Sequence, residues 1–543
     1  MKDCQVRRYL FNIVLEYRKR ISIIISLMLI SMIIGIYLPL VNQKILDEGF
    51  IRYDIISLCK NILICSMLFF LKICIDYWKE KLRIKIYLEF KKKLNLQSFN
   101  HLMKMEYFFF NTKNSAEMLN NIERDTENVS RIFDSSIFFT FTQILNIIGG
   151  IIGLLLIDFR ITICTLLTVP VKVFFSKRFS LINRELSQEY LKVDKENARY
   201  FGDAIEGIKE IKLFGVYNNK RCKFQKFQEE LYRCEYNLHL LSQKNMLVDN
   251  IIAQSIIVLI YFIGAEYFLN GSLTIGSIFS CITYGSYIIQ PIALLINVEF
   301  QLSGIVPSIK RFLEFMKMKE ESETGKIADI NDFTGDIVFQ NVNFSYEKDK
   351  RIISDFNCIF HKSCINIVIG KNGAGKTSLI NVLMRFYPLD SGNILIGEKN
   401  IKSFTIETYR RNFAVVNQNI YLFQDSIRNN ITMYQEFDDD YIYQICEMCE
   451  IMDFINSVSL DYNVGERGCR LSGGQLQKIA LARAIIMDKP IILVDEMTSN
   501  VDSLSTKKIL NVFNTALKGK TIIIITHEDE VKNIGDYVIN LTY

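Results

Sequence analysis

The sequence predicts a multi-domain chain, in which an all-α bundle of six transmembrane helices is followed by an α/β domain with a mostly parallel sheet. Of the 543 residues, 50% are hydrophobic, and the mean hydropathy is +0.16. The charged residues gather into separate stretches, and long apolar segments lie between them in the first half of the chain. From about Gly335 short β-branched runs alternate with amphipathic stretches, which is typical of α/β domains. We therefore expect a transmembrane domain over residues 1–320 and a second domain over residues 335–543.

Six apolar segments are candidate membrane spans, because a helix needs about 20 mostly apolar residues to cross the hydrocarbon core. The first segment contains no charged residue. Its basic start also resembles a secretory signal sequence, but the apolar stretch is long and no small-residue cleavage site follows, which favours an uncleaved span. The predicted spans are 21–41, 55–75, 137–157, 161–180, 251–268 and 275–297.

The basic residues near these segments predict how the chain is oriented. Lys and Arg gather before the first span and in the long connections after the second and fourth spans, whereas the other connections are short and poor in them. Because basic residues accumulate on the cytoplasmic side, we expect both termini and the second domain in the cytoplasm. Frequent Ile, Lys and Asn and the lack of a transit peptide favour a bacterial plasma membrane.

Several polar residues lie within or near the predicted spans, where polar groups are candidates for function. A lysine there can also extend its ammonium group to the membrane surface, and we favour this interpretation for Lys172. Gln290 precedes Pro291 and is a better candidate for a kink on a substrate path. The polar residues are Lys60, Lys72, Gln143, Asn146, Lys172, Gln254 and Gln290.

Charge and cysteine content exclude some other classes of protein. A net charge of +5 is slight for this length, which argues against nucleic acid as the main partner. The 13 cysteines show no repeating framework and are expected to be reduced, mostly buried side chains. Cys446 and Cys449 have the spacing of a metal or redox pair, but no second pair lies nearby, so we do not expect a zinc site.

A glycine-rich loop follows the apolar run 365–369 and matches GxxxxGK[ST] in the order strand, loop, helix. In such a loop the glycines let the backbone wrap phosphates, and the helix directs its first N–H groups at them. Lys376 would neutralise charge on the β- and γ-phosphates, and Thr377 would offer its hydroxyl to Mg²⁺. The loop comprises Gly370, Lys371, Asn372, Gly373, Ala374, Gly375, Lys376, Thr377 and Ser378.

Two carboxylates follow a second apolar run, 491–494. Ligands of open α/β sheets bind at the carboxyl ends of the strands, where these two side chains would lie. Asp495 can hold a metal ion through water, and Glu496 can act as a general base towards an attacking water. Together with the glycine-rich loop they predict an α/β P-loop nucleotide-binding domain that hydrolyses a nucleoside triphosphate.

A second run suited to an anion consists of Leu471, Ser472, Gly473, Gly474 and Gln475. Its small and hydroxyl residues let backbone N–H groups approach an anion, although the chain already has one complete phosphate-binding loop. With this run added, the chain resembles an ABC transporter, specifically a half transporter of the exporter type. The resemblance covers six spans and one nucleotide-binding domain, which is essentially the whole length.

The resemblance implies ATP and Mg²⁺ as cofactors and assigns further residues to the site. Tyr346 would stack on adenine, and Gln418 would contact the metal or water and sense the membrane domain. His527 would contact the γ-phosphate, and Asp502 would belong to the D-loop. Ser472, Gly473, Gly474 and Gln475 would close over the ATP of a second chain.

Other stretches also match the family, and some depart from it. Residues 464–468 resemble the X-loop of exporters, 207–215 the connection between the fourth and fifth helices, and 109–111 the first inner loop. In the D-loop, Asn500 and Val501 replace the usual small residue and leucine. The arginine often found after the histidine at 527 is absent.

The implied function is ATP-driven export by a permease that acts as a dimer, with ATP hydrolysis coupled to transport. One chain supplies one of each half-site, so two-fold pairing would complete both. We favour a homodimer over pairing with a related half transporter. The substrate, a small molecule, peptide or lipid, stays open. Alternatives are a membrane-bound regulatory ATPase and an exporter for self-protection against a peptide or bacteriocin.

Overall fold

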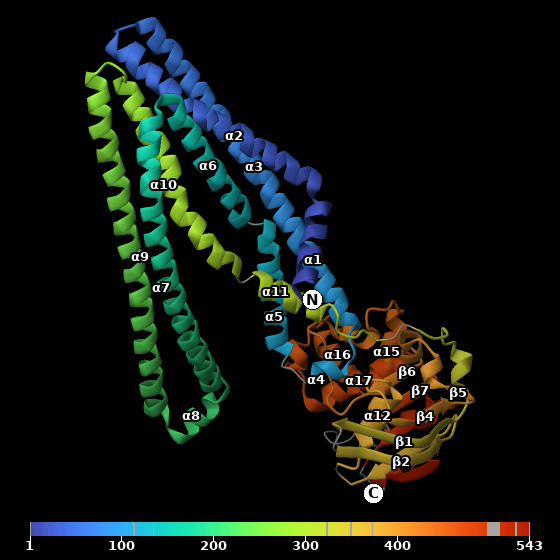
Figure 1. The fold of residues 1–543 in the computed structure, drawn as a ribbon. Coiled ribbons are helices and arrows are strands. Elements are labelled where there is room, and N and C mark those ends of the chain that lie inside the picture. Colours follow the sequence, from blue (N-terminus) through green and yellow to red (C-terminus); the bar gives the residue numbers. More distant parts are fainter. Residues whose placement is uncertain are drawn as a thin grey trace. The chain divides into compact units, whose positions relative to one another are not determined.

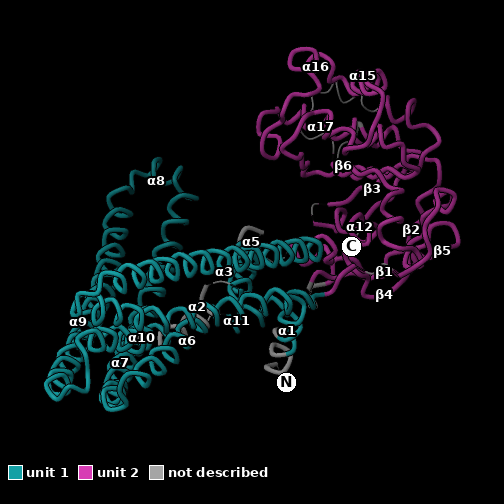
Figure 2. The backbone as a smooth tube through the Cα atoms, turned by 90° about the horizontal axis from the view of Figure 1, so that it is seen from above, with its two compact units in different colours: residues 1–102, 116–318 teal, residues 103–115, 319–543 magenta. Residues whose placement is uncertain are grey.

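The computed structural model describes residues 2–111, 115–133, 135–303, 305–321, 324–347, 350–371, 373–496, 511–526 and 529–541. The chain divides into two compact units (Figure 2). Unit 1 comprises residues 1–102 and 116–318, and unit 2 comprises residues 103–115 and 319–543. The predicted fold class is confirmed, since unit 1 is helical and unit 2 combines sheets with helices.

Unit 1 is built from long helices joined by short connections (Figure 1). The three longest, α3, α7 and α9, have 50, 48 and 53 residues. At about 1.5 Å per residue they are far longer than a membrane core, so they extend well beyond the predicted spans. The helices are α1 (Lys2–Glu16), α2 (Arg18–Lys44), the π-helix η1 (Ile45–Ile51), α3 (Ile55–Lys104), α5 (Ser115–Ser130), η2 (Arg131–Phe133), α6 (Ser135–Ile157), α7 (Phe159–Glu206), α8 (Ile208–Phe214), α9 (Tyr217–Leu269), α10 (Ile275–Ser303) and α11 (Ile305–Phe315).

Five segments among the described residues are long and apolar enough to cross a membrane: Arg18–Ile51, Ile55–Lys104, Met118–Ile157, Phe159–Glu206 and Tyr217–Leu269. Helix α10 covers the sixth predicted span, 275–297, and several of its side chains lie outside the described part of the chain. The count of six spans and their boundaries therefore stay predictions.

Two glycines bring α6 and α10 together. A Cβ atom on Gly153 would lie 2.3 Å from the ring of Tyr284, and one on Gly150 would lie 2.9 Å from the backbone oxygen of Tyr284. The Tyr284 side chain is fully buried, and its hydroxyl donates a hydrogen bond to the carbonyl of Ile36 on α2. These contacts fix the positions of α2, α6 and α10 relative to one another.

Lys172 does not extend to the membrane surface as we expected. Its side chain lies in the interior of unit 1, 2% exposed, and the ammonium donates to the carboxylate of Asp249. The two residues join α7 to α9, which run side by side and are connected through α8 (Figure 1). The interpretation that Lys172 extends to the membrane surface was wrong, because the carboxylate of Asp249, 77 residues away, pairs with its ammonium in the interior.

Unit 2 contains two sheets. The first has the antiparallel order β2-β1-β4-β5, and the second has the order β6-β7-β8-β3-β9 with every pair parallel. The strands are β1 (Ile337–Glu347), β2 (Lys350–Phe360), β3 (Ile365–Gly370), β4 (Ser391–Ile396), β5 (Lys399–Asn400), β6 (Phe413–Val416), β7 (Ile491–Asp495), β8 (Thr521–Ile525) and β9 (Tyr537–Leu541).

Helices cover both faces of the parallel sheet. Ile367 and Val494 pack into one hydrophobic cluster, whereas Val368 and Leu493 pack into the other. This two-sided burial explains why the strands are apolar runs without alternation. The helices of unit 2 are α4 (Phe108–Asn111), η3 (Ile330–Phe333), α12 (Lys376–Leu383), η4 (Ile401–Ser403), α13 (Ile406–Arg410), α14 (Ile427–Thr432), α15 (Asp439–Met448), α16 (Met452–Val458), η5 (Glu466–Gly468), α17 (Gly473–Ile486) and α19 (Asp529–Lys532).

Cys446 and Cys449 belong to one of these hydrophobic clusters. Both are buried, and burial raises the pKa of the Cys446 thiol to about 12. Such an environment suits small hydrophobic side chains and opposes the thiolate form that zinc requires.

Residues 103–115 belong to unit 2, although the first two of them are the last residues of the long helix α3. The backbone N–H of Glu321 donates to the carbonyl of Lys104 at 2.7 Å. The ring of Tyr107 lies 4.6 Å from that of Phe386 and 6.1 Å from that of Tyr387. The segment 109–111, which resembles the first inner loop of exporters, therefore belongs to the unit that carries the glycine-rich loop.

Candidate nucleotide-binding site

Strands β3, β7 and β8 are neighbours in the parallel sheet, so their carboxyl ends lie at one edge. The glycine-rich loop leaves this edge after β3, and Asp495 is the last residue of β7. The sheet topology thus brings together two motifs that are more than a hundred residues apart in the sequence. This is the edge at which open α/β folds bind ligands.

The backbone of the loop requires glycine at two positions. Gly373 and Gly375 have φ angles of +85° and +83°, in the left-handed region that side chains disfavour. Helix α12 begins directly afterwards at Lys376, with Gly375 as its N-cap. The first N–H groups of α12 therefore lie at the loop, where they can bind an anion.

Lys376 is held close to the loop. Its ammonium donates to the carbonyl of Gly370 at 2.8 Å and lies 3.7 Å from a carboxylate oxygen of Glu496. The side chain is buried. A cation between the loop and the acidic edge is positioned to neutralise phosphate charge.

Asp495 has the properties of a metal-binding carboxylate. Burial raises its pKa, whereas a hydrogen bond with Thr377 and the nearby Lys376 ammonium lower it. The carboxylate oxygen Oδ1 is buried and has no hydrogen-bond partner among the described residues. A buried carboxylate oxygen without a partner, next to the hydroxyl of Thr377, fits a hard cation such as Mg²⁺.

Within the part of the chain that is described, no group of three or more His, Cys, Asp or Glu side chains could hold a metal ion. Mg²⁺ usually takes only one or two protein carboxylates and completes its coordination with phosphates and water. The pair of Thr377 and Asp495 fits that mode of binding.

Glu496 lies next to Asp495 but is held differently. Its backbone has a φ of +50°, and its N–H donates to the carbonyl of Ile525 at 3.0 Å. The amide of Gln418, which follows β6, donates to the Glu496 carboxylate at 2.5 Å. The structure therefore places Gln418 and Glu496, 78 residues apart, in direct contact at the same edge.

Tyr346 lies beside the start of α12. Its hydroxyl accepts hydrogen bonds from Ser378 at 3.1 Å and from Asn381 at 3.0 Å, and its ring packs edge-on against Phe344 and Tyr387. The side chain is 46% exposed, which leaves surface for a planar base. Asn381 was not predicted from the sequence, because nothing in the loop motif marks the position three residues after Ser378.

The run 471–475 forms the start of α17. Ser472 is the N-cap, and it exchanges hydrogen bonds with Gln475, of 2.8 Å from Ser472 N–H to Oε1 and 3.3 Å from Gln475 N–H to Oγ. This capping box alone accounts for the serine and the glutamine. No hydrogen bond or ion pair among the described residues joins Ser472, Gly473, Gly474 or Gln475 to the glycine-rich loop of the same chain.

A second residue that sequence reasoning missed is Arg483 on α17. Its guanidinium donates to the carbonyl of Asn430 at 2.8 Å and to that of Tyr421 at 3.2 Å, and burial lowers its pKa. Arg483 thereby fixes α17 to the segment that follows Gln418. An arginine within the otherwise apolar run 479–486 was the available signal.

Three predicted site residues lie outside the described part of the chain: Asn372, Asp502 and His527. The D-loop positions 500 and 501 lie outside it as well. Their roles stay predictions.

Comparison with known proteins gives consistent matches over both units. A family model described as "ABC transporter transmembrane region" matches residues 21–292, and one described as "ABC transporter" matches residues 353–499. The chain is similar to proteins named ATP-dependent lipid A-core flippase. The one from Wigglesworthia glossinidia brevipalpis is 29% identical over 81% of this chain and 77% of its own length. Those from Photorhabdus laumondii and Escherichia coli K12 are 26% and 27% identical, over 89% and 81% of this chain and 84% and 78% of their own lengths.

Among solved structures, a bacterial Atm1-family ABC exporter with ATP bound has the same fold. The TM-score is 0.79, and the alignment covers 97% of this chain and 94% of the other at 20% identity. This likeness extends through both the helical unit and the unit that carries the glycine-rich loop.

Proposed function

The chain belongs to the ABC transporter family, and on that premise we propose that two copies form an exporter driven by the binding and hydrolysis of ATP. The observation that carries the proposal is the arrangement of the two anion-binding motifs. The glycine-rich loop and the acidic edge lie together, whereas the run 471–475 starts a helix that makes no described polar contact with them. In a two-fold dimer, the glycine-rich loop of each chain would face residues 471–475 of the other chain, and two complete sites would form.

The site residues have distinct roles in hydrolysis. Lys376 and the first N–H groups of α12 bind the β- and γ-phosphates. Glu496 accepts a proton from water as its oxygen attacks the γ-phosphorus and ADP leaves, and Gln418 holds the Glu496 carboxylate in position. Thr377 and Asp495 would hold Mg²⁺, which supplies charge neutralisation at the phosphates. His527 would contact the γ-phosphate, and Tyr346 would stack on adenine.

Closure of the dimer would drive the change in the membrane. ATP favours the closed state because only that state contacts the γ-phosphate from both chains, and hydrolysis releases it. Residues 103–115 are continuous with α3 and pack with unit 2, where Tyr107 contacts Phe386. This segment is the route by which movement at the nucleotide site reaches the membrane helices.

The similarity to lipid A-core flippases supports a lipid-like amphiphile as substrate and a bacterial plasma membrane as location. The basic residues between spans support cytoplasmic termini and a cytoplasmic nucleotide-binding domain. Glu496 is present in this chain, and one intact site per chain is what a homodimer needs.

Crosslinking of the purified chain tests the pairing. In a cysteine-free background, cysteines replace Ser472 and Lys371, both of which are exposed. With ATP and the slow-hydrolysing Glu496→Gln change, a disulfide between two copies is expected. If the chain binds ATP but no crosslinked dimer forms, a different half transporter is the partner. If the chain alone binds no ATP under any condition, the proposed function is wrong.

A further inference from the structure

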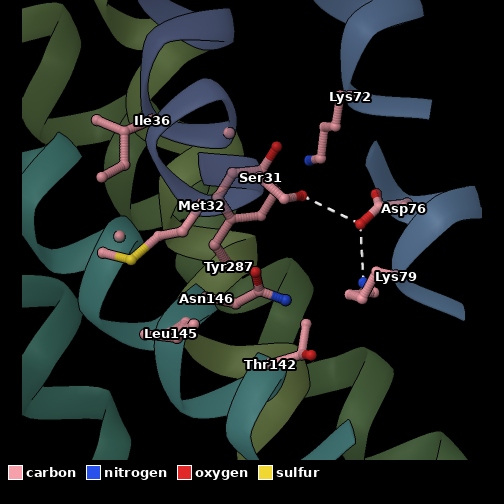
Figure 3. A pocket seen from close by; sticks show the side chains of 12 residues that line it. Ser31, Met32, Ile36, Lys72, Asp76, Lys79, Thr142, Leu145, Asn146 and Tyr287 are labelled. Carbon is pink, nitrogen blue, oxygen red and sulfur yellow. Dashed lines mark hydrogen bonds and ion pairs between the residues drawn. The ribbon is translucent and has the colours of Figure 1, made fainter. Parts of the chain in front are cut away.

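Two clusters of polar side chains lie apart from the acidic edge. In unit 1, the Asp76 carboxylate on α3 accepts hydrogen bonds from Ser31 on α2 and from Lys79 (Figure 3). That cluster joins two helices of the same unit. In unit 2, a second cluster surrounds the hydroxyl of Tyr346, which would stack on adenine. The second cluster is therefore connected to nucleotide binding.

The Tyr346 hydroxyl accepts two hydrogen bonds from α12. One comes from the Ser378 hydroxyl at 3.1 Å, and the other comes from the Asn381 amide at 3.0 Å. The phenol oxygen lies on the axis about which the ring turns, so these bonds fix where the side chain points but not the plane of its ring. Because a base would stack on the face of the ring, both the direction and the plane have to be fixed.

Two aromatic neighbours fix the plane of the Tyr346 ring. The centroids of the Phe344 and Tyr387 rings lie 4.8 and 4.9 Å from its centroid, at interplanar angles of 80° and 89°. Aromatic pairs favour such perpendicular arrangements, which oppose rotation of the ring. The Tyr346 side chain is still 46% exposed, so a base can reach it although its position is fixed.

The side chain of Asn381 makes a single hydrogen bond among the described residues, the one that it donates to Tyr346. Asn381 lies in α12, where asparagine is a poorer helix former than leucine or alanine. Neither the helix nor another polar contact therefore accounts for an asparagine at this position. Ser378 belongs to the glycine-rich loop and is itself an expected nucleotide contact, so Asn381 is the partner of Tyr346 with no other role at the site.

We propose that Asn381 is a positioning residue for the adenine base of ATP and acts through the Tyr346 hydroxyl. This inference rests on the proposed function and adds a residue that sets the affinity of its site for ATP. A ring that is already fixed loses less conformational freedom when a base stacks on it, which strengthens binding. Asn381 acts on the base and not on the reacting phosphates, so it should affect the binding of ATP and leave kcat unchanged.

Nucleotide binding and hydrolysis by the full chain in nanodiscs test the proposal. Asn381→Leu keeps the size of the side chain but removes the hydrogen-bond donor. It should raise the dissociation constant and the Michaelis constant for ATP about threefold to tenfold, whereas kcat should stay unchanged. Tripolyphosphate with Mg²⁺ has no base and should bind to the variant as tightly as to the wild type. Asn456→Leu makes the same change at an exposed position of α16 and should have no effect.

A double-mutant cycle separates positioning from a structural effect. Tyr346→Phe keeps the ring but removes the acceptor, and it should weaken ATP binding by at least as large a factor as Asn381→Leu. Adding Asn381→Leu to Tyr346→Phe should then have no further effect, because the contact is already lost. A structural defect caused by Asn381→Leu would persist in the Tyr346→Phe background.

The inference is overturned if Asn381→Leu binds ATP like the wild type, if it weakens the binding of tripolyphosphate equally, or if its effect persists beside Tyr346→Phe. Each of these results leaves ATP binding by the wild type intact and contradicts only the positioning role. A wild-type chain that binds neither ATP nor tripolyphosphate contradicts the proposed function, and this inference with it.

Discussion

Asp495 and Glu496 are neighbours in the sequence, but the end of β7 places them in different environments. Asp495 is 3% exposed, one of its carboxylate oxygens has no hydrogen-bond partner among the residues that the structure describes, and burial raises its pKa. Glu496 follows with a positive φ, which turns its side chain to meet Gln418 and Lys376. One carboxylate is thereby suited to a cation and the other to the activation of water.

Glu496→Gln should lower the rate of ATP hydrolysis by roughly a hundredfold to ten-thousandfold, because a general base contributes about that much. ATP binding should persist, since the glycine-rich loop and Lys376 are unchanged. Phosphate release and nucleotide binding, measured on the same preparation, check both statements. Glu398→Gln, at an exposed position after β4, is the matched control and should hydrolyse ATP normally. A Glu496→Gln protein with undiminished hydrolysis would exclude Glu496 as the base.

Asp495→Asn should stabilise the protein without nucleotide and remove its response to Mg²⁺. The amide keeps an acceptor for Thr377 but avoids burial of a charge, so the free energy of unfolding should rise by roughly 1 kcal/mol. Wild-type protein should gain thermal stability from Mg²⁺ with ATP, and the variant should not. Melting temperatures with and without Mg²⁺ measure this, and an equal gain in both proteins would contradict the metal assignment.

The glycine-rich loop and the acidic edge could be predicted residue by residue, because each consists of a few consecutive residues of characteristic types. The contact between Gln418 and Glu496 could not, since 78 residues separate them and only the strand order brings them together. Tyr346 could be predicted by resemblance, but its hydrogen bonds with Ser378 and Asn381 depend on how β1 approaches α12.

At the scale of elements, α7 and α9 form a pair that is joined by ion pairs of two kinds. Lys172 and Asp249 meet in the interior, whereas Asp203 and Lys220 meet at the exposed end near α8. A buried charge that loses its partner is costly, but an exposed pair contributes little. The buried pair could not be predicted from the local sequence, because its two residues lie 77 positions apart.

Asp249→Ala should destabilise unit 1 by about 3 kcal/mol, because it leaves the Lys172 ammonium buried without its partner. The double change to Lys172→Leu with Asp249→Leu should recover most of that loss. Melting temperatures in detergent give the comparison. Asp203→Ala breaks the exposed pair between the same two helices and should melt like the wild type. If Asp249→Ala has the same melting temperature as Asp203→Ala, the buried pair does not contribute to the stability of unit 1.

Residues 103–115 link the 50-residue helix α3 to the nucleotide-binding unit. Tyr107→Ala removes the ring that packs on Phe386, so substrate should no longer stimulate ATP hydrolysis, while basal hydrolysis persists. Tyr107→Phe keeps the ring and should behave like the wild type. Stimulation of ATP hydrolysis by lipid-like amphiphiles in nanodiscs is the readout, and full stimulation of Tyr107→Ala would exclude this contact as the route of coupling.

At the scale of the whole molecule, the chain carries one of each half-site. The transmembrane region and the nucleotide-binding unit each match the family, and the fold matches an exporter over nearly the full length. The sequence predicts this division from hydropathy and motif order. It does not identify the chain that completes the site, because a dimer interface is set by surfaces and not by a local pattern.

Mixed dimers test the central claim, that each site is built from two copies. Two tagged copies are co-expressed and purified on both tags in turn. With Lys376→Ala in one copy and Ser472→Arg in the other, one intact site should remain and ATP hydrolysis should persist. With both changes in one copy and a wild-type partner, each site carries one defect, and hydrolysis should be lost. The account would be contradicted if hydrolysis were lost with the changes in separate copies and persisted with both changes in one copy. It would also be contradicted if no protein carried both tags, because the two copies would then not pair.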